Sequence, residues 1–346
     1  MDVVDNILAK EELSKDDIIE LLNITSSCDL QRIFDKADQT RKEYMGDIVH
    51  MRGIIEFSNH CARWCTYCGL NAKNNELKRY RMPVEEILET AKKAHAMGYK
   101  TVVLQSGEDN YYTIEIIEDL IRKIKSEIDI VITISLGERP EEEYKRMKEA
   151  GGDRYLLKHE TSDKELYKRL HPDMKYENRI NCLKILKKLG FEVGSGIMIG
   201  LPGQSFESIA NDILLFKELE IDMIGMGPYI PHPGTDLYKD YKEKGYFTSD
   251  VSCDLEEMVY KVLAITRIVT KRTHLPATTA LATTNPARGR ELALTRGANV
   301  VMPNVTDRKY RNLYEIYPAK VCTDEKPEDC RVCINKRICS IGRTPL

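Results

Sequence analysis

The stretch GIIEFSNHCARWCTYC, residues 53–68, joins a short apolar run to three cysteines. The run has the length of a buried strand, and Cys61, Cys65 and Cys68 follow it with the spacing C-x3-C-x2-C. The chain has 346 residues and contains seven further apolar runs, each ending in small or polar residues. The eight runs lie at residues 53–57, 101–109, 130–138, 154–160, 193–203, 222–229, 275–280 and 299–304.

Charged, amphipathic stretches separate these runs and have the apolar spacing of helices. Four of them are residues 83–98, 178–190, 205–220 and 256–272. Strands that alternate with helices predict an α/β fold built on a parallel sheet, here a complete or incomplete (β/α)8 TIM-type barrel. The alternative is a doubly wound open sheet. We expect a helical N-terminal extension at 1–48, the barrel at 49–303 and a cysteine-bearing C-terminal tail with a second metal site at 304–346.

The composition favours a soluble cytoplasmic protein. The net charge is -3, from 52 basic and 55 acidic residues, and gives no argument for nucleic acid or an anionic membrane as partner. The first residues do not have the pattern of a signal peptide, and no apolar stretch reaches the length of a membrane span. Ten cysteines in a reducing compartment indicate metal binding or catalysis. Cys28, Cys182 and Cys253 stand alone and are expected to be small buried hydrophobic residues.

Polar residues gather where the strand-like runs end. In a TIM-type barrel the active site lies at the carboxyl ends of the strands. Thr133 and Ser135 are two apart on one run, so both are expected to face the barrel interior. The polar residues at three of these ends are Gln105, Ser106 and Glu108, then Thr133, Ser135 and Glu138, then Lys158, His159 and Glu160.

The cysteine triplet offers three thiolates from one compact loop. Structural zinc usually takes four ligands, often in C-x2-C pairs, whereas three closely spaced thiolates suit a 4Fe–4S cluster with one iron left open. The alternative is half of a zinc site that is completed elsewhere in the chain. Because the loop follows the first strand, we expect the metal to lie at the active-site end of the barrel.

The triplet, with Tyr67 before its last cysteine, resembles the signature of the radical S-adenosylmethionine (SAM) superfamily. The resemblance extends to the HydE family of FeFe-hydrogenase maturases through an ordered set of stretches over residues 45 to 320. It implies that the open iron chelates SAM and that one electron cleaves SAM to a 5′-deoxyadenosyl radical. The stretches include RYRM, LQSGED, SLGE, RYLLKHET, ENRINC, GLPGQ, PHPGT, PATTA, ANVVMPN and LYEIYPAK.

The resemblance also assigns the residues that contact SAM. Glu160 and Arg179 are expected to hold its polar end, since a guanidinium fork suits the SAM carboxylate. The alternative is that these two side chains pair with each other or with surface partners. Tyr67 and Ser135 are expected in the same pocket. The run 197–201 is expected to pack on the adenine, with ordinary strand core as its alternative.

A second set of residues maps onto the inner cavity of the family. Thr278 and Thr279 on their own have the pattern of strand residues. Tyr314 and Tyr317 are three apart and could form one aromatic face of a helix packed in the core. The full set is Gln105, Ser106, Thr133, Thr278, Thr279, Met302, Tyr314 and Tyr317.

The C-terminal cysteines form a second group. Cys322, Cys330 and Cys333 have the spacing C-x7-C-x2-C and resemble the accessory cluster site of the HydE family, whereas Cys339 lies outside that pattern. The group is expected to hold a 2Fe–2S or 4Fe–4S cluster, or a zinc ion, with Cys339 as a possible extra ligand. This site is expected to be peripheral to the chemistry.

The resemblance implies a radical SAM enzyme that helps to assemble the di-iron site of FeFe-hydrogenase. Its substrate would be an iron complex that carries carbon monoxide, cyanide and cysteine. The implied partners are other maturases (an iron-complex supplier and a scaffold GTPase) and an electron donor. One alternative is a radical SAM mutase or synthase of the 3-methylornithine synthase or biotin synthase type, acting on a small amino-acid-like substrate. A non-catalytic iron–sulfur carrier is another.

Overall fold

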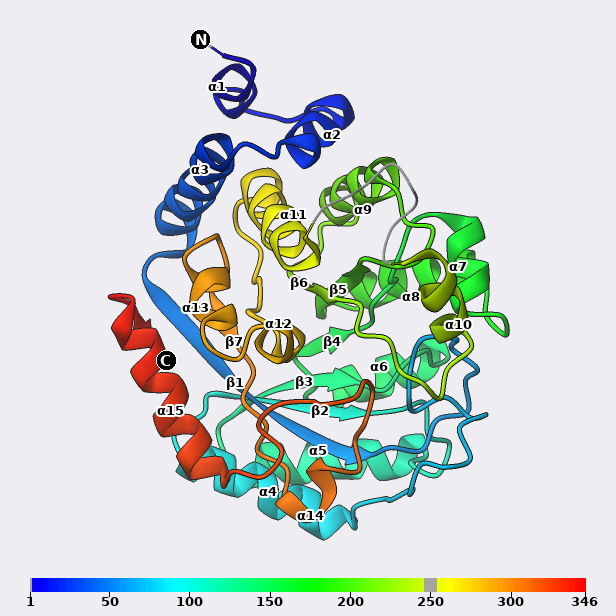
Figure 1. Ribbon diagram of the computed structural model, residues 1–346. Helices are drawn as coiled ribbons and strands as arrows, with labels where there is room; N and C mark the ends of the chain where they lie inside the picture. The colour runs from blue at the N-terminus through cyan, green and yellow to red at the C-terminus, as the bar shows by residue number, and fades with distance from the viewer. Residues whose placement is uncertain (1, 246–253) are drawn as a thin grey trace.

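A parallel β-sheet forms the centre of the molecule (Figure 1). The computed structural model describes residues 2–245 and 254–346. Hydrogen-bonded neighbours follow the order β6-β5-β4-β3-β2-β1-β7, and β8 pairs with the start of β1. The strands are β1 (Ile48–Ser58), β2 (Thr101–Ser106), β3 (Val131–Ser135), β4 (Arg154–Leu156), β5 (Glu192–Ile199), β6 (Met223–Pro228), β7 (Val300–Val301) and β8 (Thr344–Pro345).

Residues 274–277 close the gap between β6 and β7. His274 forms a parallel bridge with Met223, and Pro276 forms one with Val300. This run was expected to be a strand, but only isolated bridges form, because Pro276 has no N–H and Thr278 already caps a helix. The bridges complete the ring, so the predicted TIM-type barrel is confirmed and the open-sheet alternative is wrong.

Helices cover the outer face of the sheet (Figure 1). The four helices predicted from spacing are confirmed as α4 (Val84–Ala96), α8 (Tyr176–Lys188), α9 (Phe206–Glu218) and α11 (Leu255–Thr270). The others around the barrel are α5 (Ile114–Glu127), α6 (Glu141–Glu149), α7 (Lys164–Leu170), α10 (Leu237–Lys244), α12 (Thr279–Thr284), α13 (Gly289–Leu294), α14 (Arg308–Arg311) and α15 (Pro327–Ser340). None of the described helices is long and apolar enough to cross a membrane.

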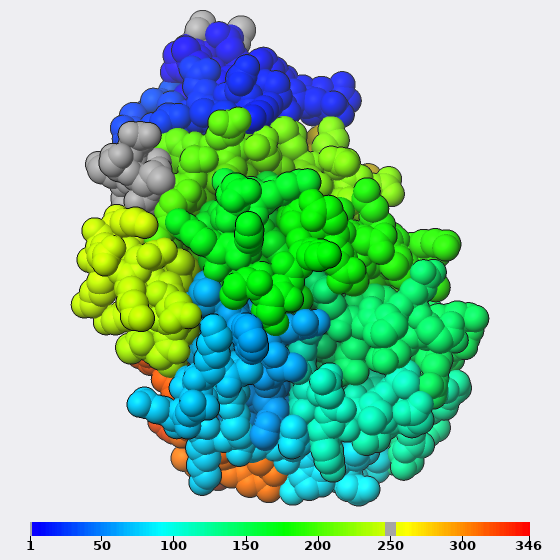
Figure 2. Space-filling model, turned by 90° about the vertical axis from the view of Figure 1, so that its right-hand side faces the viewer, coloured from blue at the N-terminus to red at the C-terminus, as the bar shows by residue number. Residues whose placement is uncertain are grey.

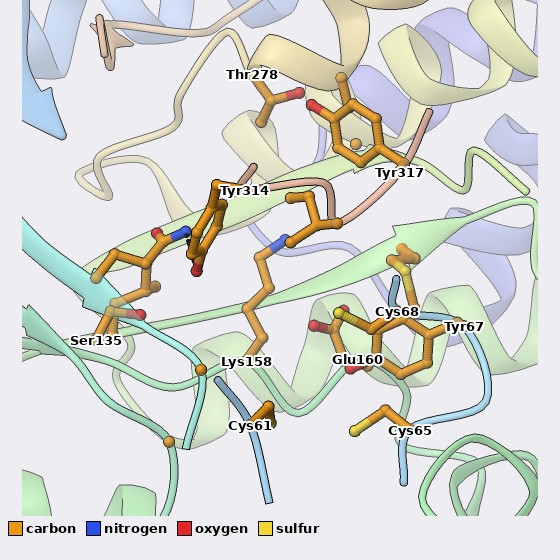
Figure 3. Close-up of a pocket in the computed structure, with 18 of the residues that line it drawn as sticks. Cys61, Cys65, Tyr67, Cys68, Ser135, Lys158, Glu160, Thr278, Tyr314 and Tyr317 are labelled. Atoms are coloured by element: carbon orange, nitrogen blue, oxygen red, sulfur yellow. Dashed lines mark hydrogen bonds between the residues drawn. The ribbon is translucent and has the colours of Figure 1, made fainter. Parts of the chain in front are cut away.

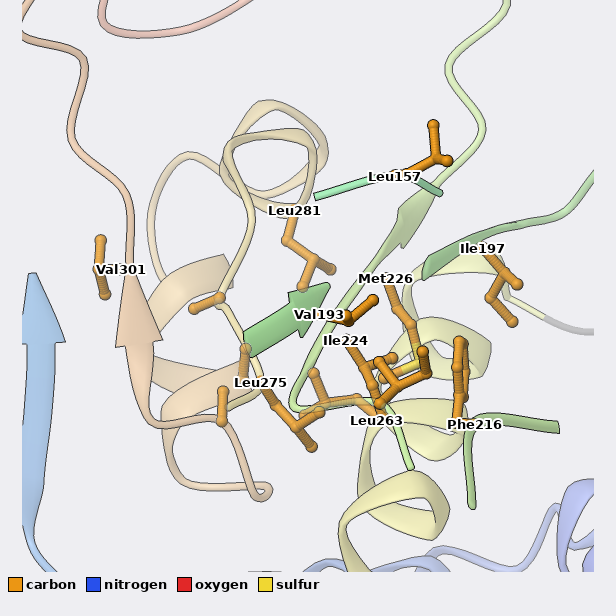
Figure 4. Packing of buried hydrophobic residues seen from close by; sticks show 14 of the residues in the cluster. Leu157, Val193, Ile197, Phe216, Ile224, Met226, Leu263, Leu275, Leu281 and Val301 are labelled. Atoms are coloured by element: carbon orange, nitrogen blue, oxygen red, sulfur yellow. The ribbon is translucent and has the colours of Figure 1, made fainter. Parts of the chain in front are cut away.

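The hydrophobic core lies between the sheet and these helices. Val193 and Ile197 are four apart on β5, so they share one face of the strand. Both are fully buried, and Figure 4 shows them on the side of the strand where Phe216 of α9 and Leu263 of α11 lie. Alternate β5 residues face the barrel interior, which leaves that surface free for a site.

The two ends of the chain pack against the barrel. The N-terminal helices α2 (Lys15–Asn23) and α3 (Ser27–Met45) lie on α9 and α11, and α1 (Val3–Leu8) packs on α3. Lys261 of α11 donates to the carbonyl of Leu22 at 3.0 Å. At the other end, Thr344 of β8 lies opposite Ile48 of β1.

The three single cysteines differ in their surroundings. Cys182 is buried in α8, as expected, whereas Cys28 is exposed near the start of α3, so the expectation of a buried residue is wrong there. Cys28 lies in the first turn of α3 and faces solvent, where no packing contact selects for an apolar side chain. Cys253 lies outside the described residues.

Candidate active site

Glycines on β5 and β6 make room inside the barrel. A Cβ added at Gly227 would lie 2.9 Å from Thr278 Oγ1, and one at Gly225 would lie 3.3 Å from Lys158 Cε. Larger residues here would displace side chains that face the interior. The resulting cavity has a volume of about 370 Å³ and opens at the carboxyl ends of the strands.

Most of the predicted site residues line this one cavity. Figure 3 shows the three cysteines with Tyr67 and Glu160 at one end, and Tyr314, Tyr317 and Thr278 at the other, with Lys158 between them. The lining residues predicted from the sequence are Cys61, Cys65, Tyr67, Cys68, Gln105, Ser106, Ser135, Glu160, Arg179, Thr278, Thr279, Met302, Tyr314 and Tyr317.

Two predicted groups only partly reach the cavity. Thr133 is buried but is not among the lining residues, and its hydroxyl has no hydrogen-bond partner in the described part of the chain. In the run 197–201 only Met198 lines the cavity; Ile197 and Ile199 belong to the core. Alternation along β5 explains the second case, because adjacent residues face opposite sides of the sheet. It does not explain the position of Thr133, which has the same parity as Ser135.

The cysteine loop is fixed by backbone hydrogen bonds to three other segments. Ala62 N donates to Glu108 O at 2.9 Å, Thr66 N to Leu170 O at 2.9 Å, and Gly69 N to Ile316 O at 3.0 Å. On the molecular surface the blue segment after β1 lies among the green and yellow-green segments that follow later strands (Figure 2). The loop therefore holds the thiols at the cavity mouth.

The surroundings of the three thiols favour binding of a positively charged iron–sulfur core. All three are free, and all three line the cavity. Burial raises the pKa of the Cys68 thiol to about 12 and raises those of Cys61 and Cys65 as well. Thiolates at these positions need a cation to offset the lost hydration, and an iron–sulfur core supplies it.

Glu160 faces the cavity from an unusual backbone conformation. Its φ is 66°, in the left-handed region, and its N–H donates to Gly196 O at 2.9 Å. The carboxyl group is buried, which raises its pKa, and Oε2 has no hydrogen-bond partner in residues 2–245 and 254–346. A buried carboxyl without a partner fits a ligand that brings a cation or hydrogen-bond donors.

Arg179 does not pair with Glu160. Its Nε donates to Glu138 Oε1 at 2.6 Å, and both side chains are 7% exposed. Its Nη1 donates to the carbonyl of Lys158. The alternative that Arg179 and Glu160 neutralise each other is therefore wrong, and Glu160 stays available to a ligand.

A second charged pair supports the cysteine loop. Arg63, between the first two cysteines, forms an ion pair with Glu108, whose Oε1 also accepts from the N–H of Glu138 at 3.0 Å. The two glutamates thus link the cysteine loop to Arg179. Both stand at the ends of strand-like runs, which was the only signal for them in the sequence.

Sequence reasoning missed the charged pair at the inner end of the cavity. Glu56 of β1 is buried, pairs with Lys320 and accepts from Asn304 Nδ2 at 2.6 Å. Lys320 Nζ also lies 5.1 Å from the centre of the Tyr314 ring. These contacts link the loop after α14 to the first strand.

Tyr314 and Tyr317 lie on this loop and not on a helix. Helix α14 ends at Arg311, so the alternative of one aromatic helical face is wrong. The Tyr314 hydroxyl accepts from Gln105 Nε2 at 3.2 Å. Thr278 likewise leaves its expected strand, because its side chain accepts from Leu281 N and caps α12.

His171 is a further site residue that sequence reasoning missed. It lines the cavity, and its Nδ1 lies 3.3 Å from Cys65 Sγ. Burial, with Arg179 and Arg63 nearby, holds its pKa well below the usual range. No sequence spacing relates His171 to the triplet.

The C-terminal cysteines divide into a group of three and one outlier. Cys322 lies on a loop beside Cys330, and Arg290 Nη1 is 3.9 Å from its sulfur; the Cys330 contact and Arg290 lower the pKa of the Cys322 thiol. Cys333 is exposed one turn after Cys330 on α15. Cys339 follows Cys330 by nine residues, about 13.5 Å along α15 and half a turn around it, so it cannot join the same small cluster.

The barrel, its cysteine loop and the cavity define a radical SAM enzyme. Residues 55–216 match the family model of the radical SAM superfamily. Membership implies a 4Fe–4S cluster and SAM as cofactors. The solved structure of methylornithine synthase (PylB) superposes with a TM-score of 0.83 at 26% identity, over 100% of this chain and 97% of that one. The maturase HydG shares the fold, with a TM-score of 0.80 at 19% identity, over 99% and 74%.

Sequence comparison identifies the family within the radical SAM superfamily. The [FeFe] hydrogenase maturase subunit HydE of Thermotoga maritima is 47% identical over 338 residues, which cover 98% of this chain and 93% of that protein. The 3-methylornithine synthase of Methanosarcina acetivorans is 31% identical over 86% of this chain and 81% of that protein. The chain belongs to the HydE family of hydrogenase maturases.

Proposed function

We propose that this chain acts in the assembly of the di-iron site of FeFe-hydrogenase. The 47% identity to HydE across nearly the whole of both chains carries this proposal. The barrel at 49–303 is proposed as the catalytic unit, with 1–48 as a packed extension and 304–346 as a tail that also closes the cavity.

The cysteine end of the cavity is proposed to hold the cofactors. Cys61, Cys65 and Cys68 would bind the 4Fe–4S cluster, which when reduced supplies the electron that cleaves SAM. Glu160 would accept hydrogen bonds from the ammonium group or ribose of SAM, since its carboxyl is buried without a partner. Arg179 would present its remaining N–H groups to the SAM carboxylate while Glu138 fixes its orientation.

The inner end of the cavity is proposed to bind the substrate. Lys158, Gln105 and the hydroxyl groups of Thr278 and Tyr314 line it. A cation among hydrogen-bond donors suits an anionic iron complex that carries carbon monoxide, cyanide and cysteine. Another maturase would supply this complex, a scaffold GTPase would receive the product, and a separate protein would donate electrons.

Anaerobic reconstitution tests this function. The protein is supplied with iron, sulfide, SAM, a reductant and the iron product of the supplying maturase. We expect 5′-deoxyadenosine and a new iron-bound species in electron paramagnetic resonance and infrared spectra. Cys65→Ala is expected to abolish SAM cleavage, because two thiolates cannot hold the cluster with one iron open. SAM cleavage that leaves the iron complex unchanged would contradict the proposed substrate.

A second candidate is a synthase or mutase that acts on an amino-acid-like molecule. The 31% identity to 3-methylornithine synthase favours it over other radical SAM reactions. The same reconstitution with amino acids in place of the iron complex, read by mass spectrometry, distinguishes the two. A rearranged amino acid formed at the rate of SAM cleavage would support this second function.

The second metal site is proposed at Cys322, Cys330 and Cys333. Cys322 and Cys330 already contact each other, and Cys333 lies one helical turn from Cys330. Three thiolates suit an iron–sulfur cluster better than a structural zinc ion, which usually takes four ligands.

A further inference from the structure

His171 lies directly beside the second cysteine of the triplet. It is the C-cap residue of α7, it is 1% exposed, and its Nδ1 is 3.3 Å from Cys65 Sγ. Cys65 and His171 are 106 residues apart in the sequence. This distance is in the range of a hydrogen bond between a ring nitrogen and sulfur.

Backbone contacts fix the two residues relative to each other. Thr66, next to Cys65, donates its N–H to Leu170 O at 2.9 Å and its hydroxyl to Arg169 O at 3.0 Å. These carbonyl groups immediately precede His171. Two hydrogen bonds therefore join the end of α7 to the cysteine loop and keep the backbone of Cys65 beside that of His171.

Two aromatic rings hold the imidazole in its orientation. The Tyr67 ring meets it edge-on with a centroid distance of 5.4 Å, and the Tyr167 ring packs on it at 4.5 Å. A ring that is packed on both sides keeps Nδ1 directed at Cys65. The second ring nitrogen, Nε2, has no hydrogen-bond partner in the part of the chain that the structure describes.

We propose that His171 donates an Nδ1–H···Sγ hydrogen bond to Cys65 and thereby raises the reduction potential of the bound cluster. A metal-bound thiolate has only lone pairs to offer, so the hydrogen must come from the imidazole. Reduction adds negative charge to the cluster and its sulfurs, which strengthens such a bond, and hydrogen bonds to sulfur are a known determinant of cluster potential. The inference rests on the proposed function, in which Cys65 binds the cluster.

Paired amide substitutions test the bond. The amide N–H of His171→Asn can occupy the place of Nδ1, whereas that of His171→Gln reaches only toward the place of Nε2. His171→Phe removes both nitrogens and keeps an aromatic ring. Tyr167→Phe is the matched control, because it keeps the packing on His171 and does not touch sulfur.

The readout is an anaerobic redox titration of the reconstituted cluster by electron paramagnetic resonance, with iron content measured on each sample. For His171→Gln and His171→Phe we expect the ratio of reduced to oxidised cluster at fixed solution potential to fall about tenfold, or about 59 mV. The reduction potentials of His171→Asn and Tyr167→Phe should stay near that of the wild-type protein.

The outcomes separate this inference from the proposed function. Equal potentials in His171→Asn and His171→Gln, with full iron content, would overturn the hydrogen bond while leaving the cluster assignment intact. A wild-type protein that binds no cluster at the triplet would instead refute the proposed function. If His171→Phe does not fold, the Asn and Gln pair still decides the question.

Discussion

The backbone conformation of Glu160 lowers the stability of the fold and places its carboxyl group in the cavity. A non-glycine residue in the left-handed region costs about 1–3 kcal/mol and persists only where the surroundings enforce it. The surroundings here are the bond from its N–H to Gly196 and the buried turn that follows. The conformation directs the carboxyl group into the cavity, where it has no partner among the described residues.

Replacing Glu160 separates these two effects. We expect Glu160→Gly to be more stable than Glu160→Ala by about 1 kcal/mol, because glycine adopts this φ without strain. Both variants should lose SAM affinity to the same extent, since neither has the carboxylate. Anaerobic thermal unfolding and SAM titration measure the two quantities. Equal stability of the two variants would contradict the strain.

Arg179 is constrained by Glu138 as well as by the proposed ligand. Arg179→Met alone leaves the Glu138 carboxylate buried, and we expect a loss of about 3–5 kcal/mol in the free energy of unfolding. The double variant Arg179→Met/Glu138→Leu should recover most of that loss. SAM affinity should fall about ten- to a hundredfold in both, from a lost charge-assisted contact of about 1.5–3 kcal/mol.

The double variant is the control for this prediction. If it regains both stability and SAM affinity, Arg179 acts only by neutralising Glu138 and does not contact SAM. If affinity stays low while stability returns, the direct contact is supported.

At the scale of elements, helix α9 holds the turn after β4 in place. Asp212 of α9 accepts from Ser162 N at 2.5 Å and lies 3.3 Å from His159 Nε2. His159 Nδ1 is 2.9 Å from Ser195 Oγ on β5. All three side chains are fully buried, so this chain of contacts ties the residues on both sides of Glu160 to a helix and a strand.

Loss of the α9 anchor should therefore affect both folding and binding. Asp212→Ala leaves the Ser162 N–H and the His159 ring without their acceptor, and an unsatisfied buried group costs about 1–3 kcal/mol. We expect a lower unfolding temperature and a SAM affinity that falls less than in Glu160→Ala. Asp212→Asn keeps the acceptor oxygen, so its unfolding temperature and SAM affinity should lie between those of wild type and Asp212→Ala. Unchanged SAM affinity in Asp212→Ala would show that the turn holds its shape without α9.

At the scale of the whole molecule, the tail contributes to the barrel interior and carries the cysteines of the proposed second metal site. Lys320 lines the cavity two residues before Cys322, and β8 returns to β1 at the opposite end. The tail is thus bound to the barrel at both of its ends.

Cysteine substitutions in the tail test whether this site is separate from the chemistry. We expect Cys330→Ser/Cys333→Ser to lose the second metal signal while SAM cleavage persists, with a less ordered tail because metal binding contributes to local folding. Cys339→Ser is the matched control and should keep the full metal content, since Cys339 lies on the far face of α15. Iron analysis and 5′-deoxyadenosine formation are the measurements. Lost cleavage with the first cluster intact would place the second site in the reaction.

The sequence alone determined the barrel class and the cysteine triplet. Both depend on short-range order: the alternation of apolar runs with helical spacing, and three thiols within eight residues. It also placed most of the cavity residues through family resemblance. Whether an apolar run becomes a regular strand depends on its pairing with neighbouring strands, which the sequence does not encode locally. Residues 274–277 were predicted as a strand, but they close the ring with isolated bridges alone.

Only the tertiary structure decided which charged and polar groups meet. Arg179 and Glu138 are 41 residues apart, Cys65 and His171 are 106 apart, and Glu56 and Lys320 are 264 apart. No local pattern encodes such a pair, because each side chain could find a partner or solvent in many arrangements until the barrel brings the strand ends together. That closure decides the partner of Arg179 and the approach of His171 to the cysteine loop. Helix geometry places Cys339 away from Cys330 and so from the proposed tail site.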